Sequence, residues 1–331
     1  MGRADGAGPG GQDVARVVAT LRRLPPHGGG RPAGAAAGLP GGPARADLRE
    51  PVTPLAGPPP DLRRWPMRAQ APPARSPLAF FALVFLLTVP FLALHALSDA
   101  QLLPGLPPAA LAVVCPVTAA MILEHRRGGR ASVGALLRRS FDFARIPAKG
   151  WYVPILLLHP AVLVASYAYL RLSGVEVPGP RISLVPVLAM GTAFFAAALC
   201  EELGWTAYAV DALRERWSAP ATALIVGSVW AVWHWPALLQ AHRTVSWIAW
   251  WSLATVAMRV IMVWLYENTG RSVFAVTLFH MVSNLGWQVF PVHGSYFDQP
   301  SVAVLLALVA VVIVVIREPG TLAKPRRGHG R

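Results

Sequence analysis

From Pro77 onward the chain consists of apolar runs separated by short polar or basic clusters. A run of about 18 or more apolar residues is long enough for a helix to cross the hydrocarbon core of a bilayer. Barrel strands would instead give short alternating segments, so helices are the expected spanning element. We therefore predict an all-α fold, a polytopic membrane helical bundle of about eight transmembrane helices. The eight apolar runs are 78–97, 106–124, 151–172, 183–210, 219–240, 247–266, 272–290 and 300–316.

Composition divides the chain into three parts. Residues 1–75 are rich in Gly, Pro, Ala and Arg and hold few of the apolar clusters that build a core, so we expect a disordered tail. A true start of translation at Met67 is the alternative. Residues 76–318 form the predicted membrane domain, and 319–331 form a basic tail. Within the domain, 132–147 is too charged to span and is expected to lie at the membrane interface as an amphipathic helix.

The basic residues indicate how the bundle is oriented. The net charge is +14, but Lys and Arg lie between apolar runs and not on one face or arm, which argues against nucleic acid as a partner. With a cytoplasmic N-terminus and eight spans, the segments from Arg63 onward place nineteen Lys and Arg on the cytoplasmic side and only Arg171, Arg181 and Arg243 on the other. This asymmetry predicts a multi-pass protein of the cell (plasma) membrane with both termini cytoplasmic.

Ionisable side chains inside apolar runs are costly in lipid and indicate functional positions. Glu201 and Glu202 lie at such a position, and neighbouring helical residues point about 100° apart. One carboxylate is therefore expected to face the site while the other orients a partner. A carboxylate in such surroundings suits a general base that activates water. The alternative is a pair that only marks a helix end at the membrane surface.

Two later runs carry further candidates. His234 follows Trp230 by one helical turn on the same face, and Pro236 should loosen the helix there. His280 and Asn284 share one face of one helix, where an amide and an imidazole could hold a developing oxyanion. The alternatives are a satisfied core or interface histidine for His234, and an interhelical hydrogen-bonding pair for His280 and Asn284.

Arg259 lies within the sixth run and needs an acidic partner. Counting 1.5 Å per residue puts Glu201, Arg259 and His280 about 12–15 Å from the cytoplasmic ends of their spans. His234 lies about 24 Å from the start of its span on the same count, so tilt or a deeper start would be needed to bring it to the same depth.

The order Glu-Glu, aromatic-xxx-His and His-xxx-Asn on separate apolar runs resembles the CPBP family of intramembrane endopeptidases. This family includes CAAX proteases, bacteriocin-processing enzymes and the type II CAAX prenyl endopeptidases. The resemblance covers roughly 78–316 and includes the run WLYENTGRSVFAVTLFH that leads into His280. It implies that 76–318 is an intramembrane protease domain of the glutamate type, acting on a peptide or protein substrate at the bilayer.

The resemblance also implies a role for each candidate residue. Glu201 would be the general base that activates a water molecule, assisted by His234. His280 and Asn284 would stabilise the tetrahedral oxyanion, and Glu202 would be a supporting acid.

This sequence departs from the motifs of the family at two positions. The first motif commonly reads Glu-Glu-xxx-Arg, but the Arg position is Thr206 here. The aromatic position of the second motif, often Phe, is Trp230. We hypothesise that Arg259 supplies the positive partner of Glu202 that the first motif lacks.

No cofactor and no metal are expected, because neither HExxH nor another helix motif with two histidines is present. A zinc ion held by two His and a Glu is the alternative. Two other classes of function also stay open. Buried Glu and His can form the relay of a proton-coupled transporter, although no internal repeat typical of transporters is recognisable. A non-catalytic immunity or scaffold membrane protein is the third class.

Overall fold

The computed structural model describes residues 74–98, 107–292, 298–318 and 320–323. The tail predicted at 1–75 lies outside the described residues except for 74 and 75. The basic tail predicted at 319–331 lies outside them except for 320–323.

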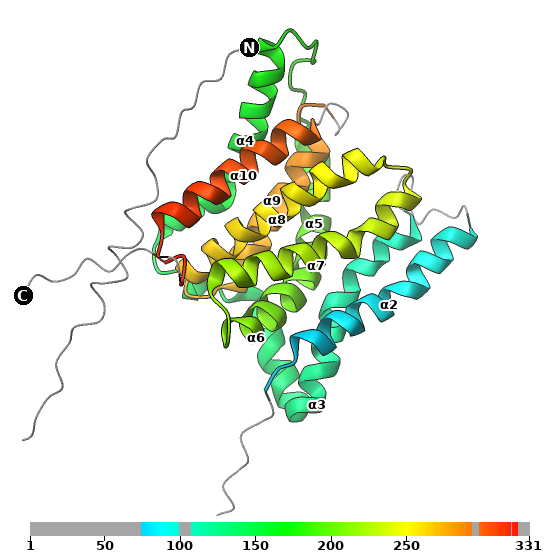
Figure 1. Cartoon of the computed structure of the whole chain (residues 1–331), viewed down its shortest axis with the longest axis vertical. Coiled ribbons are helices and arrows are strands. Elements are labelled where there is room, and N and C mark those ends of the chain that lie inside the picture. Colours follow the sequence, from blue (N-terminus) through cyan, green and yellow to red (C-terminus); the bar gives the residue numbers. More distant parts are fainter. Residues whose placement is uncertain (1–73, 99–106, 293–297, 319, 324–331) are drawn as a thin grey trace, which may run out of the picture. The chain divides into compact units, whose positions relative to one another are not determined.

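The described residues form helices and no strand, which confirms the predicted all-α membrane bundle (Figure 1). Within these ranges, seven helical segments are long and apolar enough to cross a membrane, and an eighth apolar helix, α9, has 17 residues. The helices are α2 (Pro77–Leu97), α3 (Cys115–Leu137), α4 (Tyr152–Leu172), α5 (Leu184–Gly204), α6 (Asp211–Arg214), α7 (Ala219–Gln240), α8 (Val245–Asn268), α9 (Val273–Val289) and α10 (Gln299–Ile316). Short segments η3 (Pro108–Val114), η4 (Arg138–Phe141), η5 (Phe143–Arg145) and η6 (Lys149–Trp151) are 3₁₀-helical.

The segment 132–147 differs from its prediction as a separate amphipathic helix. Gly128 and Gly129 have non-helical backbone angles, and Gly129 has a positive φ of 63° that glycine adopts readily. The chain bends there, resumes the helix to Leu137, and then continues as the 3₁₀ turns η4 and η5. This segment is therefore a helix end followed by turns, and its polar side chains bind to the rest of the bundle.

The fourth predicted run becomes one continuous helical segment of mixed type. After α5, residues Trp205–Val210 form a π-helical turn, η7, and the chain then continues into α6. All six residues of η7 are buried. π-Helical turns are rare and often lie at functional sites. This one follows directly after the Glu201–Glu202 pair.

Glycine allows the helices that carry candidate residues to approach closely. α7 packs along α8, and α5 packs against both α3 and α9. A Cβ atom at Gly227 on α7 would lie 3.0 Å from the Cβ of Arg259 on α8. A Cβ at Gly204 would lie 2.6 Å from the carbonyl oxygen of Pro116. Small residues at such crossings are typical of helix packing in membranes.

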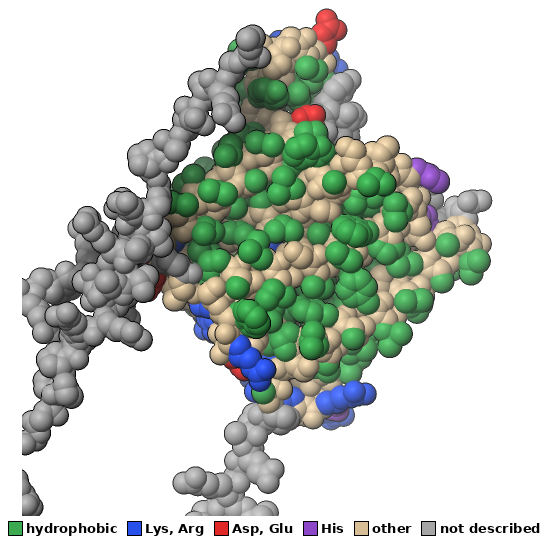
Figure 2. All heavy atoms as spheres, viewed as in Figure 1, with side chains coloured by type: hydrophobic (Ala, Val, Ile, Leu, Met, Phe, Trp, Pro, Cys, Tyr) green, Lys and Arg blue, Asp and Glu red, His purple; other side chains and the backbone are tan. Residues whose placement is uncertain are grey.

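The outer surface of the bundle suits contact with lipid. Large apolar side chains such as Leu86, Leu188 and Leu308 are more than half exposed. Figure 2 shows hydrophobic side chains spread over the whole of the face in view. Lys and Arg gather at the end of the bundle where α3 and α6 lie (Figure 2).

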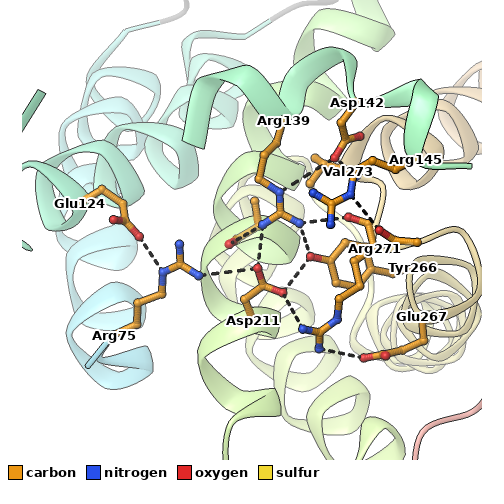
Figure 3. A network of polar contacts seen from close by, with 12 residues as sticks. Arg75, Glu124, Arg139, Asp142, Arg145, Asp211, Tyr266, Glu267, Arg271 and Val273 are labelled. Atoms are coloured by element: carbon orange, nitrogen blue, oxygen red, sulfur yellow. Dashed lines mark hydrogen bonds and ion pairs between the residues drawn. The ribbon is translucent and has the colours of Figure 1, made fainter. Parts of the chain in front are cut away.

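A polar network at this basic end joins segments that are far apart in the sequence (Figure 3). Arg139 on η4 donates to the carboxylate of Asp211 at 2.7 Å, to the Tyr266 hydroxyl, and to the carbonyl oxygen of Arg271 at 3.1 Å. The Tyr266 hydroxyl in turn donates to Asp211 at 2.8 Å. Arg139 thereby links α6, α8 and the connection before α9.

Asp142 fixes the start of α9. Its carboxylate accepts from the backbone N–H groups of Val273 and Phe274, at 3.3 and 3.0 Å, and from the Ser272 hydroxyl at 2.8 Å. The first N–H groups of a helix have no partner within the helix, so an acceptor placed there stabilises its start. Because α9 is held at this end, the position of His280 two turns later is fixed as well.

We expect the Asp142→Ala substitution to lower the free energy of unfolding by about 1–2 kcal/mol, since it removes this cap. Asp142→Asn keeps one oxygen acceptor and should cost less. Thermal unfolding of the purified protein in detergent measures the effect. Ser76→Ala removes a single exposed cap contact on α2 and serves as a control with a smaller effect. An Asp142→Ala variant that unfolds like the wild type would contradict the capping role.

Candidate functional site

A cavity of about 320 Å³ inside the bundle brings together the four residues predicted to be catalytic. Glu201 reaches it from α5, His234 from α7, and His280 and Asn284 from α9. The helices that carry them are separated by tens of residues, so only the packing of the bundle places these side chains around one space.

Trp230 orients the carboxylate of Glu201. The indole Nε1–H donates to Oε2 of Glu201 at 2.8 Å, and both side chains are buried. The aromatic residue of the second motif is thus a hydrogen-bond donor as well as a packing group. Glu201 lines the cavity while one of its oxygens is held from α7.

Glu202 points to a different set of partners and is fully buried. Arg259 binds it with two nitrogens, Nη1 to Oε2 at 2.8 Å and Nη2 to Oε1 at 3.2 Å. Thr206 donates its hydroxyl to the same carboxylate. The contact predicted between Arg259 and Glu202 is therefore present, and Thr206 at the motif position adds a neutral donor beside it.

Arg259 also stacks on Trp230. Its guanidinium carbon lies 4.2 Å from the centroid of the indole ring, a cation–π geometry, and the arginine is completely buried. Trp230 therefore makes two contacts in the site. Its indole N–H binds Glu201, and its ring face packs against Arg259, the partner of Glu202.

The partners of the two histidines indicate which ring nitrogen carries a proton. His280 Nδ1 lies 2.9 Å from Oε1 of Glu202, and His234 Nδ1 lies 2.8 Å from the carbonyl oxygen of Trp230. Carboxylate and carbonyl oxygens only accept, so Nδ1 is the donor in both rings. The second nitrogen, Nε2, is left for other partners in each ring.

His234 lies closer to the other candidates than counting along the helices suggested. It lines the same cavity as Glu201 and His280, and its ring centroid is 4.6 Å from that of Trp233 and 4.9 Å from that of Trp251. Helices that cross at an angle do not keep equal depth at equal residue counts.

The rest of the cavity wall is mainly aromatic and apolar, and these side chains were not predicted from the sequence. Arg243 and Trp247 both line the cavity, and the Arg243 guanidinium lies 4.7 Å from the ring centroid of Trp247. Other lining side chains include Leu238, Trp251, Met258, Trp287, Val302 and Leu306.

Several polar residues of the cavity wall were also not predicted, among them His159 and Gln299. His159 on α4 is 4% exposed, and Gln299 at the start of α10 is 3% exposed. His159 interrupts the apolar run 151–172 as His234 interrupts its own run, so the rule that singled out His234 applied to it too. Gln299 precedes its apolar run and gave no comparable signal.

The zinc alternative would need Glu201, His234 and His280 as ligands. Among the described residues, no three His, Cys, Asp or Glu side chains are grouped closely enough to hold a metal ion. Glu202 is engaged by the Arg259 guanidinium, and His280 uses Nδ1 on Glu202. These contacts leave Nε2 of His234 and of His280 unused.

Comparison with known proteins confirms the family resemblance. Residues 183–286 match the family model described as "Type II CAAX prenyl endopeptidase Rce1-like". The chain is also 25% identical over 208 residues to the CAAX prenyl protease 2 of Methanococcus maripaludis. The aligned segment covers 58% of this chain and 72% of that protein. Residues 183–286, which match the family model, contain Glu201, His234, His280 and Asn284. These similarities and the apolar helices indicate a multi-pass membrane protease.

The buried ion pair predicts a specific pattern of stability. Arg259→Met should lower the free energy of unfolding by about 3–5 kcal/mol, because it leaves the Glu202 charge buried without its partner. Arg259→Lys should recover only part, since one ammonium cannot bind both carboxylate oxygens in the same way. Thermal unfolding in detergent gives the comparison.

The matched control is the double variant Glu202→Gln with Arg259→Met, in which neither charge is left. We expect it to be more stable than Arg259→Met alone. Equal stability of wild type and Arg259→Met would contradict a structural role for the ion pair.

Proposed function

We propose that the chain is an intramembrane endopeptidase that hydrolyses a peptide bond of a membrane-associated peptide or protein. One observation carries the proposal: Glu201, His234, His280 and Asn284 line one cavity within a bundle of apolar helices. A general base, two imidazoles and an amide are the groups that water activation and oxyanion binding require. The similarity to a CAAX prenyl protease supports the same reaction class.

In the proposed first step, Glu201 acts as general base. Trp230 occupies one oxygen of this carboxylate, so the other oxygen is available to accept a proton. A water molecule gives its proton to Glu201 while its oxygen attacks the carbonyl carbon of the scissile bond. Nε2 of His234 accepts a hydrogen bond from the same water and orients it.

In the proposed intermediate, Asn284 and His280 bind the oxyanion. The Asn284 amide donates directly. His280 donates through Nε2 when both ring nitrogens are protonated, and the Glu202 carboxylate on Nδ1 stabilises that cation. Arg259 holds Glu202 in place for this role. Glu201 then returns its proton to the departing nitrogen, the C–N bond breaks, and a carboxylic acid and an amine are released.

We propose that the reaction proceeds without a metal cofactor, because among the described residues no three His, Cys, Asp or Glu side chains are grouped closely enough to hold an ion. Location in the plasma membrane with both termini cytoplasmic is part of the same proposal. It is supported by the unequal distribution of Lys and Arg along the chain.

Cleavage of a library of membrane-tethered peptides by the protein in lipid vesicles tests the function. Glu201→Gln should lower the rate by at least about 100-fold, the usual minimum for loss of a general base. Asn284→Ala should lower it by about 100- to 1,000-fold, as removal of one oxyanion donor does. We expect no effect of a chelator. Thr277→Val changes a buried residue on α9 that does not line the cavity and should leave cleavage unchanged.

Full cleavage by Glu201→Gln would overturn the proposed base. Loss of wild-type cleavage on adding a chelator would instead require a metal-assisted reaction. Absence of cleavage, together with proton flux across the vesicles, would favour the transporter.

The proposed orientation is tested by introducing one cysteine at a time into a Cys200→Ala variant. The remaining native cysteine, Cys115, is buried and should not react. An impermeant thiol reagent should label R181C in intact cells and E318C only after the membrane is opened. Arg181 lies in the connection between α4 and α5, and Glu318 follows α10. Labelling of both positions in intact cells would contradict the expected placement of the C-terminal end.

A further inference from the structure

Two buried polar atoms in the cavity residues are without a hydrogen-bond partner in the described part of the chain. They are Nδ1 of His159 and Oε1 of Gln299. A buried polar atom without a partner costs about 1–3 kcal/mol, so a folded protein seldom keeps one unless a ligand or water completes it. The mechanism above uses neither residue.

Packing fixes the ring of His159 beside the helix that carries His280 and Asn284. A Cβ atom at Gly286 on α9 would lie 2.7 Å from the Leu163 side chain and 3.7 Å from Nδ1 of His159. The same ring meets Phe279 edge to face with centroids 6.4 Å apart. Gly286 thus lets α4 approach α9 closely, and His159 is positioned by contacts that leave Nδ1 unused.

Gln299 lies at the start of α10, which hydrogen bonds of the neighbouring residues hold in place. Asp298 caps α10 by accepting from the backbone N–H of Ser301 at 2.9 Å. The Ser301 hydroxyl is hydrogen-bonded to the Ser166 hydroxyl, which joins α10 to α4. Gln299 takes no part in these bonds. It lines the cavity, and its side-chain oxygen has no hydrogen-bond partner among the described residues.

We propose that His159 and Gln299 form a subsite that binds the main chain of the peptide substrate away from the scissile bond. The inference rests on the proposed peptidase function. Each residue of a peptide main chain other than proline presents one N–H donor and one C=O acceptor. Oε1 of Gln299 accepts from a substrate N–H, and His159 bonds an adjoining main-chain group.

The surroundings favour main-chain binding over recognition of a charged side chain. Apart from Glu201 and the histidines, Arg243 is the one ionisable residue that the described residues contribute to the cavity wall, and it lies beside Trp247. Aromatic and aliphatic groups cover most of the remaining wall and can receive apolar side chains. Both α4 and α10 lie outside the matched segment 183–286, so this subsite belongs to the part of the bundle around it.

The test separates binding from chemistry by using Glu201→Gln, which should hold substrate uncleaved. Immobilised Glu201→Gln protein in lipid vesicles is incubated with the pool of membrane-tethered peptides, and the retained peptides are quantified by mass spectrometry. Adding Gln299→Leu or His159→Phe should weaken retention about fivefold to tenfold, the loss expected for one hydrogen bond to a buried group. With Glu201 intact, the same two changes should raise KM more than they lower kcat.

A backbone change in the substrate identifies the hydrogen bond directly. Replacing one peptide N–H at a time by an ester oxygen should weaken binding at one position in the parent protein. It should have no further effect at that position in Gln299→Leu. Gln240→Leu is the matched control, because Gln240 also has an unpartnered side-chain oxygen among the described residues but does not line the cavity.

Unchanged retention in both variants, or an equal ester penalty with and without Gln299, would overturn the subsite. His159→Gln keeps a hydrogen-bonding group and should restore part of the retention lost in His159→Phe, which distinguishes lost binding from misfolding. Retention that depends on Gln299, without any cleavage by the protein that keeps Glu201, would leave the subsite standing and overturn the peptidase proposal. Cleavage by the protein that keeps Glu201, together with retention that does not depend on Gln299, would support the peptidase proposal and overturn the subsite.

Discussion

The completely buried ion pair between Arg259 and Glu202 is the interaction on which the site depends. A charge in the low-dielectric interior is tolerated only when its partner stays in place. Arg259 comes from α8 and Glu202 from α5, while His280 on α9 and Trp230 on α7 complete the group. Displacing any of these four helices would disturb the compensation of a buried charge, so charge pairing sets their relative positions.

The neighbouring glutamates divide two tasks that one carboxylate could not perform together. Glu202 is surrounded by donors and serves as a fixed anchor, whereas Glu201 faces the cavity with one oxygen held by Trp230. Their divergence follows from the 100° rotation between adjacent helical residues. The π-helical turn that follows keeps the chain helical and fully buried as far as Asp211, where the polar network of the basic end begins.

Much of this arrangement could be predicted from the sequence, because lipid imposes simple rules. Apolar runs gave the helices, and the need of Arg259 for an acid gave its contact with Glu202. The depth of His234 could not be obtained by counting, since crossing angles depend on packing at sites such as Gly227. Contacts between distant segments, such as Asp142 at the start of α9, leave no local pattern. His159 was overlooked although the rule for buried ionisable residues covered it.

The family motif places an arginine four residues after Glu202 on the same helix, whereas here the guanidinium arrives from α8 and a threonine hydroxyl occupies the motif position. A pattern written along the chain scores this substitution as a defect. A template written in three dimensions, which asks only for a cation against that carboxylate, scores it as intact. Sorting active from degenerate members of such a family by linear motifs alone would therefore discard chains in which the required group has moved to another helix.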